Sequence, residues 1–296
     1  MAIPATQKQT EFPRALAPSE FLKELSAELA GGDVRLPSFP DIAQRVQRAL
    51  EDPRATPVQV ARVIGIDAAL AVRVLRLANS AFLNPSAKPI TELQQAVNRL
   101  GHQLVRCTAV SFALQQMNSG DSVAALRPQL QELWRKGTLV ASIAYVLARE
   151  TRAANPDEAL VAGLMHNIGS LYIAVRAHQH GAVLGADDAA TRVLNNGHPR
   201  IAGAILGHWK FAPSIVSAVS NQNASSNLPA AGPVGLADVL IASISLVPCV
   251  FFRGLLDETV TGVAAFQRLA LDTTECTRLL RTTARQIKSL HSALVA

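Results

Sequence analysis

The sequence predicts an all-α protein, and three observations support that prediction. Start and stop signals of helices recur along the 296 residues, apolar side chains recur at helical spacings, and no stretch shows sustained alternation of apolar and polar residues. Hydrophobic residues make up 49% of the chain and aromatic residues only 4%. The apolar content is therefore mostly Ala, Leu, Val and Ile, which suits close packing of helices. This length is enough for one large domain or for two modest lobes.

The first lobe is expected to span residues 17–120, after a flexible leader over residues 1–16. Thr56-Pro57-Val58-Gln59 offers a hydroxyl cap, a proline at the first helical position and the glutamine of a capping box. Gly65 can end that helix, and Asp67 can cap the next one.

Another capping box is predicted at Thr91-Glu92-Leu93-Gln94, and Gly101 is predicted to end the helix that starts there. The second lobe is expected over residues 121–228. Its longest apolar stripe follows one helical face and consists of Leu126, Leu130, Leu133, Gly137, Val140, Ala144 and Leu147. Asn155-Pro156-Asp157-Glu158 then has the start signals of the helix that contains His166.

The C-terminal helices, over residues 229–296, are expected to pack on the second lobe, and Asp272-Thr273-Thr274-Glu275 starts the last of them. Four basic residues of this last helix share one face: Arg278, Arg281, Arg285 and Lys288. The face is either an ordinary solvated surface or a contact for phosphate or an acidic partner, and the net charge of +6 allows both interpretations. The scarcity of aromatic residues argues against a binder of single-stranded nucleic acid.

The cysteines and the apolar windows suggest a cytoplasmic protein. Cys107, Cys249 and Cys276 lie far apart and form no CxxC pair, so we expect reduced thiols. The first 20 residues contain no apolar signal sequence. The most apolar window, Val239 to Phe252, is too short to cross a bilayer, so no membrane association is expected.

Several segments, in order along the chain, resemble the HDOD family of bacterial all-α signalling domains, which are related to the HD phosphohydrolases. The similarity covers about residues 20–240. The matching segments are Leu36-Pro37-Ser38-Phe39-Pro40, Asp67 to Leu70, Arg73 to Phe82, Pro89 to Val97, Arg99-Leu100-Gly101, Val105-Arg106, Ala162 to His166, His198, Gly203, Trp209 and Pro213. The resemblance implies an HD-related fold of two helical lobes, with the second lobe HD-like. It also implies a regulatory module without established catalysis, associated with signalling proteins and cyclic-dinucleotide pathways.

The same resemblance identifies where a catalytic metal would be held. Active HD phosphohydrolases use a histidine from an early helix, an adjacent His-Asp pair and a later aspartate. In this chain no histidine occurs near Trp134 to Gly137, where Arg135 or Lys136 would repel a cation. The pair is His166-Asn167, and Asp238 matches the later aspartate. Further histidines of the family would fall near Asn221-Gln222-Asn223, which are all amides.

His166 and Asp238 are too few ligands for a hard cation, which needs about six ligands, or for zinc, which needs three or four from the protein. The sequence therefore predicts no metal, no cofactor and no catalysis, with His166, Asn167 and Asp238 as vestigial positions. His166 is expected to be buried and hydrogen-bonded near Asn167 or to Asp238. The alternative is a weak metal-dependent phosphohydrolase that uses His166, Asp238 and unrecognised ligands.

Candidate residues for binding a partner or ligand lie in and after the helix that begins near Asp67. They are Arg73, Arg76, Asn79 and Ser80, with Arg99 and Arg106 from later helices. One interpretation is an ordinary amphipathic helix with hydrogen bonds at its end. The other is that Asn79, Arg99 and Arg106 fix the geometry between lobes or contact a partner. We predict a non-catalytic signalling module that binds a protein partner or a nucleotide ligand.

Overall fold

The computed structural model describes residue 27 and residues 41–52, 54–80, 83–86, 88–117, 121–179, 189–223, 232–251, 256 and 258–295. Within these residues every regular element is a helix, which confirms the predicted all-α class. The predicted leader over residues 1–16 and the family segment Leu36 to Pro40 lie outside the described residues.

The N-terminal group consists of α2 (Asp41–Glu51), α3 (Pro57–Ile64), α4 (Ala68–Ala78) and α5 (Leu93–Met117). The middle of the chain forms η1 (Asp121–Leu126), α6 (Arg127–Thr151), α7 (Pro156–Met165), α8 (Ile168–Gln179), α9 (Ala189–His208) and α10 (Pro213–Ser220). The C-terminal group consists of α11 (Leu236–Phe251), α12 (Glu258–Thr261), α13 (Ala264–Arg268) and α14 (Thr273–Val295).

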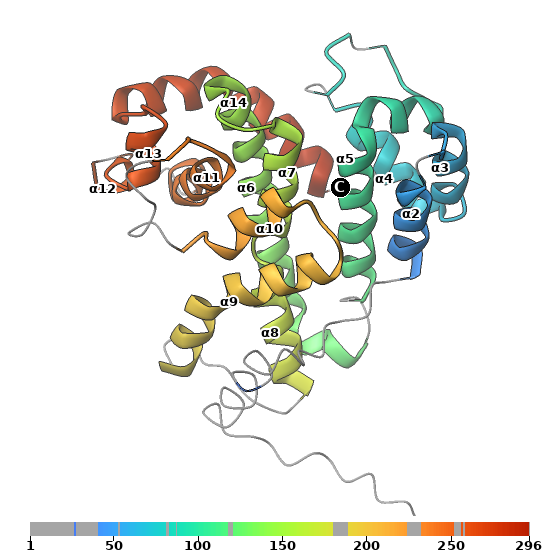
Figure 1. The fold of residues 1–296 in the computed structure, drawn as a ribbon, viewed down its shortest axis with the longest axis horizontal. Helices are drawn as coiled ribbons and strands as arrows, with labels where there is room; N and C mark the ends of the chain where they lie inside the picture. Colours follow the sequence, from blue (N-terminus) through green and yellow to red (C-terminus); the bar gives the residue numbers. More distant parts are fainter. Residues whose placement is uncertain are drawn as a thin grey trace, which may run out of the picture.

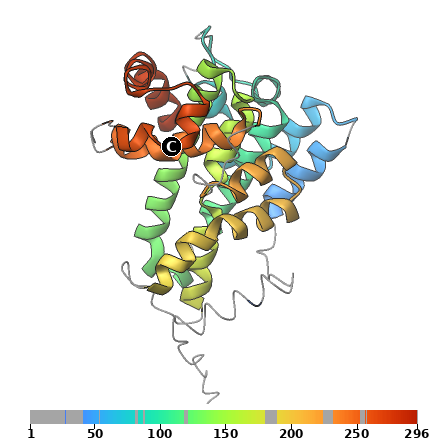
Figure 2. The same ribbon diagram turned by 60° about the vertical axis from the view of Figure 1, so that its left-hand side comes forward.

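Figure 1 shows α2 to α5 on one side of the molecule and α11 to α14 on the other, with α6 and α7 between them. Helix α7 packs against α6, and α8 packs against α9 (Figure 2). Helix α14 contacts both α6 and α4, so the C-terminal group touches the N-terminal one as well as the centre.

Four of the predicted N-terminal caps are confirmed, at Thr56, Asp67, Asn155 and Asp272, whereas the capping box at Thr91 stays a prediction. Thr56 and Gln59 form the reciprocal capping box at the start of α3. The carboxylate of Asp67 accepts from the first backbone N–H groups of α4, and the side chain of Asn155 does the same for α7. Asp272 accepts from the backbone N–H of Glu275 at 2.7 Å. These helix starts follow from local sequence, because each cap satisfies backbone donors that the helix leaves unpaired.

Gly101 ends the first part of α5, as predicted, and a second helical segment follows it directly. The backbone of Gly101 has a φ of 69°, which is not helical and separates two helical segments between Leu93 and Met117. Glycine adopts this positive φ without steric cost. The second segment begins at once because the residues that follow, including Leu104, Val105 and Ala109, are buried and pack on the core.

The buried apolar residues form two clusters that share α6. The first cluster joins α2 to α5 with α7 to α10 and includes Val140 and Ala141 of α6. The second joins the other side of α6, including Ile143, with α11, α13 and α14. The clusters do not follow the expected boundaries at residues 120 and 228, so the division into 17–120, 121–228 and 229–296 stays a prediction.

Two glycines allow the central helices to approach closely. A Cβ atom on Gly163 of α7 would lie 2.4 Å from the Cα of Ala141 of α6. A Cβ atom on Gly169 of α8 would lie 2.0 Å from the carbonyl oxygen of His198 of α9. Both distances are impossible for real atoms, so these contacts require glycine and hold the turn between α7 and α8 in place.

The stretch from Pro156 to Gln179 is apolar and long enough to cross a membrane by length and composition, but 72% of its apolar window is buried inside the protein. It also consists of two helices, α7 and α8, which are interrupted at His166 and Asn167. These helices therefore belong to the buried core of the protein.

Candidate functional site

His166 lies in the turn between α7 and α8, and only 8% of its surface is exposed. Its Nδ1 atom lies 2.7 Å from the carbonyl oxygen of Gly163. A carbonyl can only accept a hydrogen bond, so we assign the proton to Nδ1 and the lone pair to Nε2. Burial lowers the pKa of His166 to about 4, so the ring is neutral at pH 7.

Asn167 follows His166 and acts as a hydrogen-bond donor. Its Nδ2 atom donates to the carbonyl oxygen of Leu133 in α6. An aspartate, the residue of the family's His-Asp pair, could not make this bond when ionised, because a carboxylate only accepts. The side chain at this position therefore joins α6 to the α7–α8 turn.

Amide side chains also occupy the end of α10, where the family resemblance implied histidines. The Nε2 atom of Gln222 donates to the carbonyl oxygen of His166 at 2.7 Å and to that of Val219 at 3.1 Å, and Gln222 is only 5% exposed. Asn221 donates to the carbonyl oxygen of Ser217 at 2.8 Å. The buried amide of Gln222 thus satisfies a backbone acceptor of the α7–α8 turn, whereas the exposed Asn221 bonds within the end of α10.

Basic groups replace ligands on the side of α6. The positive charge of Lys136 adds to the burial that lowers the pKa of His166. The pKa of His198 in α9 is also lowered to about 4, first by burial and then by His166. No group of three or more His, Cys, Asp and Glu side chains gathers in the part of the chain that the structure describes. The groups around His166 are a second imidazole, amides and a cation, without a carboxylate among the described residues, and this set fits a hard cation poorly.

Asp238 is bound by other partners. Its Oδ1 atom accepts from Nε of Arg268 at 2.6 Å, and its Oδ2 atom accepts from the backbone N–H of Gly235 at 2.9 Å. The side chain of Asp238 is 3% exposed and that of Arg268 is 13% exposed. The expected hydrogen bond between His166 and Asp238 is therefore not formed. The carboxylate instead holds the start of α11 against α13.

The candidate residues after α4 stabilise a loop. The side chain of Asn79 donates to the carbonyl oxygens of Leu75 (2.9 Å) and Ile90 (2.7 Å) and accepts from the backbone N–H of Ile90 at 2.8 Å. The buried hydroxyl of Ser80 accepts from the N–H of Leu83, and Arg99 donates to the side chain of Asn84 at 3.3 Å. This arrangement agrees with the interpretation of hydrogen bonds at a helix end.

Arg106 joins the N-terminal helices to the middle of the chain. It donates from Nη2 to the carbonyl oxygen of Trp209, at the end of α9. Its guanidinium lies 4.4 Å from the centre of the Phe211 ring. Burial lowers the pKa of Arg106, and Glu51 of α2 partly opposes that effect. These contacts link α5 to the end of α9, and a role of Arg106 in contacting a partner stays a prediction.

Arg73 and Arg76 differ in their surroundings. The guanidinium of Arg73 lies 5.5 Å from the centre of the Phe112 ring, and its Nη1 atom is buried without a hydrogen-bond partner among the described residues. Arg76 is exposed, and burial and the charge of Arg76 together lower the pKa of Arg73. Arg73 therefore packs between α4 and α5, whereas Arg76 lies on the outer surface of α4.

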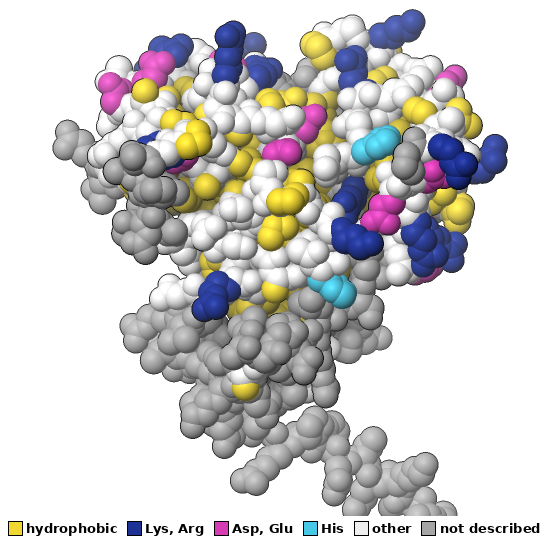
Figure 3. Space-filling view, in the orientation of Figure 1, with side chains coloured by type: hydrophobic (Ala, Val, Ile, Leu, Met, Phe, Trp, Pro, Cys, Tyr) yellow, Lys and Arg dark blue, Asp and Glu magenta, His cyan; other side chains and the backbone are white. Residues whose placement is uncertain are grey.

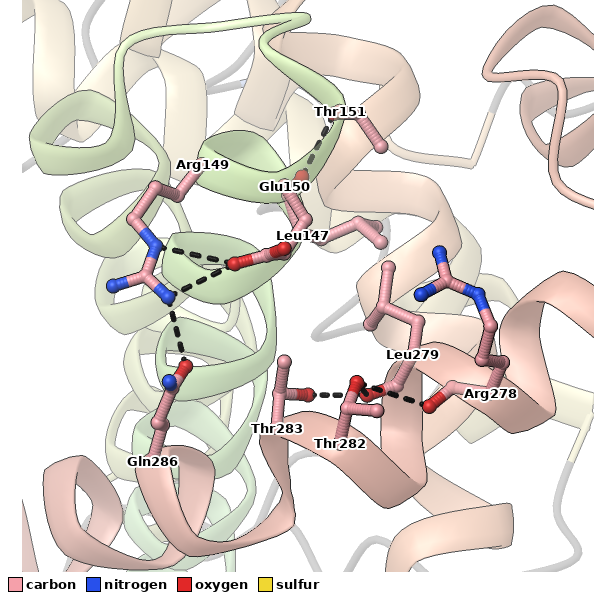
Figure 4. A network of polar contacts seen from close by, with 9 residues as sticks. All are labelled: Leu147, Arg149, Glu150, Thr151, Arg278, Leu279, Thr282, Thr283 and Gln286. Atoms are coloured by element: carbon pink, nitrogen blue, oxygen red, sulfur yellow. Dashed lines mark hydrogen bonds and ion pairs between the residues drawn. The ribbon is translucent and has the colours of Figure 1, made fainter.

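The four basic residues of α14 are all exposed, but they do not form one equivalent set. Arg278 is held by Glu275. Arg281 and Lys288 line a groove beside α14, whereas Arg278 and Arg285 do not. On the neighbouring side, Arg149 and Gln286 link α6 to α14 through a hydrogen bond of 2.9 Å (Figure 4).

In Figure 3 the basic side chains gather over the outer helices α2 and α3 more than over the centre of the visible face.

Sequence reasoning did not identify Arg268 or the role of Gln222. Arg268 lies 30 residues after Asp238, and Gln222 is not part of a recognised motif. No local spacing in the sequence therefore connects either residue to its partner. The charge of Arg268 and the apolar surroundings of Asp238 were the only signals present in the sequence.

Comparisons with known proteins place this arrangement in a family. The HDOD domain family matches residues 36–225, which is more than half of the chain. A curated relative, an uncharacterised protein of Treponema pallidum (strain Nichols), is 23% identical over 95% of this chain and 54% of its own length. The chain therefore spans about half the length of that relative.

Solved structures share the fold. A "Putative metal-dependent phosphohydrolase" from Shewanella amazonensis SB2B has a TM-score of 0.74 and 25% identity, covering 94% of this chain and 99% of that one. An HDOD domain protein with unknown function from Geobacter sulfurreducens has a TM-score of 0.59 and 23% identity, covering 93% and 98%. A "Putative signal transduction protein" from Marinobacter aquaeolei VT8 has a TM-score of 0.55 and 20% identity, covering 97% and 68%. The chain belongs to the HDOD domain family, with an all-α, HD-related fold.

Proposed function

We propose that this chain is a cytoplasmic regulatory module that acts by binding a signalling partner or a nucleotide-like ligand and does not hydrolyse phosphate esters. The observation that supports this proposal most directly is the hydrogen bond from Asn167 to the carbonyl oxygen of Leu133. It fixes an amide where the family resemblance implies a metal-binding carboxylate. The similarity to the "Putative signal transduction protein" of Marinobacter aquaeolei VT8 and the association with cyclic-dinucleotide pathways that the family resemblance implies favour a signalling role.

The electrostatics around His166 support the same conclusion. Lys136 places a positive charge near the ring, and the carboxylate of Asp238 is already neutralised by Arg268. A cation at His166 would have to overcome the repulsion of Lys136 without a carboxylate in compensation. Hydroxide generated on a metal, which HD phosphohydrolases require, has no support from these residues.

The second candidate function is a weak metal-dependent phosphohydrolase, favoured by the structural similarity to the Shewanella amazonensis protein of that name. Metal analysis of the purified protein separates the two candidates. We expect substoichiometric Mn, Fe, Zn and Mg, and no metal-dependent hydrolysis of bis(p-nitrophenyl) phosphate. One equivalent of bound metal, together with turnover that a His166→Gln variant loses, would establish the phosphohydrolase and refute the regulatory proposal.

A groove beside α14 supports a protein as the partner. It has a volume of about 1040 Å³ and is lined by apolar residues that include Leu139, Val250 and Ile287. The exposed Arg281 and Lys288 also line it and have no ion-pair partner among the described residues. They are seven residues apart on one helix, which separates them by about 10 Å. This pattern is complementary to an amphipathic helix with acidic residues two turns apart.

A synthetic amphipathic peptide with glutamates seven residues apart tests this groove, with a peptide that has lysines at the same positions as its comparison. We expect the acidic peptide to protect Cys249, which lines the groove, from maleimide labelling. Cys107 and Cys276 are buried, and burial raises the pKa of their thiols to about 12 and about 11, so they should react slowly.

The double variant Arg281→Glu with Lys288→Glu should lose this protection, and Arg285→Glu, an equal charge change on the same helix outside the groove, should keep it. Equal protection by both peptides would refute the proposed acidic partner.

A further inference from the structure

A cavity lies where α5, α6, the α7–α8 turn and the end of α14 meet. Its volume is about 540 Å³, within the range of roughly 300 to 1000 Å³ that is typical of small-molecule sites. It is distinct from the groove beside α14 that was proposed to bind a protein partner. Asn167 lines this cavity, so the position of the lost carboxylate borders a space of ligand size.

The walls of the cavity are mainly apolar and include two aromatic rings. Phe112 of α5 and Trp134 of α6 line it, together with aliphatic side chains of α6, α7 and α8 such as Leu130, Met165 and Leu171. The indole N–H of Trp134 is buried and has no hydrogen-bond acceptor among the described residues. The orientation of the indole ring is therefore not fixed by a hydrogen bond of this N–H within the described residues. A ring that can reorient suits a cavity wall that contacts a planar ligand.

The charged residues that line the cavity are all basic. They are Arg127, at the first position of α6, and Arg135, and no aspartate or glutamate among the described residues lines the space. Arg135 is partly neutralised by Glu132, which binds it through two hydrogen bonds of 2.8 and 2.9 Å. Arg127 is exposed and has no ion pair within the described part of the chain. It can therefore bind an anion without first breaking an ion pair.

We propose that this cavity binds a small anion with a planar aromatic body, whose phosphate or carboxylate is held by Arg127 and whose ring lies between Phe112 and Trp134. The inference rests on the proposed function, because it supplies the ligand class of a module that binds and does not hydrolyse. The ligand-binding role here requires no metal and no bond cleavage.

Binding of 8-anilinonaphthalene-1-sulfonate, a planar aromatic anion, tests the proposal, with N-phenyl-1-naphthylamine as its uncharged analogue. Trp134 and Trp209 are the two tryptophans of the chain, and Trp209 is only 2% exposed, so Trp134 is the natural reporter. We expect saturable binding at one site, with quenching of tryptophan emission that Trp134→Phe abolishes. The uncharged analogue should bind about tenfold more weakly, as expected for the loss of one charged hydrogen bond.

Arg127→Gln should weaken binding of the sulfonate about tenfold and leave the uncharged analogue unaffected. Arg285→Gln, an identical change at an exposed residue that lines neither this cavity nor the groove, is the matched control. Equal affinities of the two variants, or quenching that persists in Trp134→Phe, would overturn the proposal.

Competition identifies the source of the anion. Displacement by guanosine monophosphate assigns a phosphate ligand, displacement by indole-3-acetate assigns a carboxylate, and displacement by neither refutes the proposed class. The competition results do not bear on the proposed absence of hydrolysis, because metal content and phosphodiesterase activity are measured separately. A negative result for ligand binding in the cavity is thus distinguishable from a negative result for the proposed function.

Discussion

The His166–Asn167 turn and the Asp238–Arg268 pair both occupy positions where the family resemblance implies metal ligands, but they are stabilised by opposite means. In the turn, an amide replaces the carboxylate and donates to the backbone of α6. In the pair, the carboxylate is retained and its charge is neutralised by an arginine. A position of the family's metal ligands can therefore carry a different residue, or keep its residue bound to another side chain. The second case leaves the family motif intact in the sequence.

The largest expected effect comes from filling the contact that holds the turn. Gly169→Ala should prevent folding or lower the melting temperature severely, because its Cβ would lie 2.0 Å from the backbone oxygen of His198. Gly197→Ala, in the same pair of helices, meets no atom within 4 Å and should be neutral or stabilising by up to about 1 kcal/mol. Thermal unfolding by circular dichroism compares them, and equal melting temperatures would show that α8 and α9 are not packed so closely.

A pH titration tests the burial of the turn. The pKa of His166 is about 4 in the folded protein and near 6.5 when unfolded, so the unfolded chain binds more protons between these values. The contribution of His166 to stability should therefore be full above pH 6.5 and fall by about 3 kcal/mol as the pH decreases to 4. Urea unfolding at several pH values measures this loss. His166→Gln should make the profile shallower without flattening it, because the pKa of His198 is also lowered to about 4 and contributes a loss of the same sign. An unchanged profile in His166→Gln would show that His166 is not buried in its neutral form.

Replacing Asn167 by the aspartate of the family's His-Asp pair tests the role of the amide as a hydrogen-bond donor. Asn167→Asp removes the donor to Leu133 and places a carboxylate against its carbonyl oxygen, so we expect a loss of about 2 kcal/mol at pH 7. The difference from the wild type should shrink at low pH, where a protonated aspartate can donate. Urea unfolding gives the stability, and a phosphodiesterase assay with Mn²⁺ should detect no turnover. Measurable hydrolysis by this single variant would contradict the loss of the site.

The smallest expected effect belongs to the ion pair. Asp238→Asn keeps the shape of the side chain but removes the charge that Arg268 binds, and should cost about 1.5 kcal/mol in urea unfolding. Adding Arg268→Gln should cost little more, because the two residues act as one unit. Fully additive losses would show that Asp238 and Arg268 stabilise the fold independently.

Local sequence was sufficient to predict much of the fold. The caps at Thr56, Asp67, Asn155 and Asp272 were predicted correctly because each cap depends on residues within one helical turn. Gly101 shows the limit of this reasoning. The glycine ends one helical segment, as predicted, but the start of the next segment directly after it depends on apolar residues that pack on distant helices.

The candidate site divides in the same way. The sequence by itself determined the all-α class, the family and the replacement of ligands at Asn167 and near Lys136, because residue identity alone decides which atoms can bind a cation. Only the tertiary structure decided that Asn167 donates to Leu133, that Arg268 neutralises Asp238 and that Arg106 binds the end of α9. These contacts join residues 30 to 103 positions apart, and their geometry follows from how the helices pack and not from any periodicity in the chain.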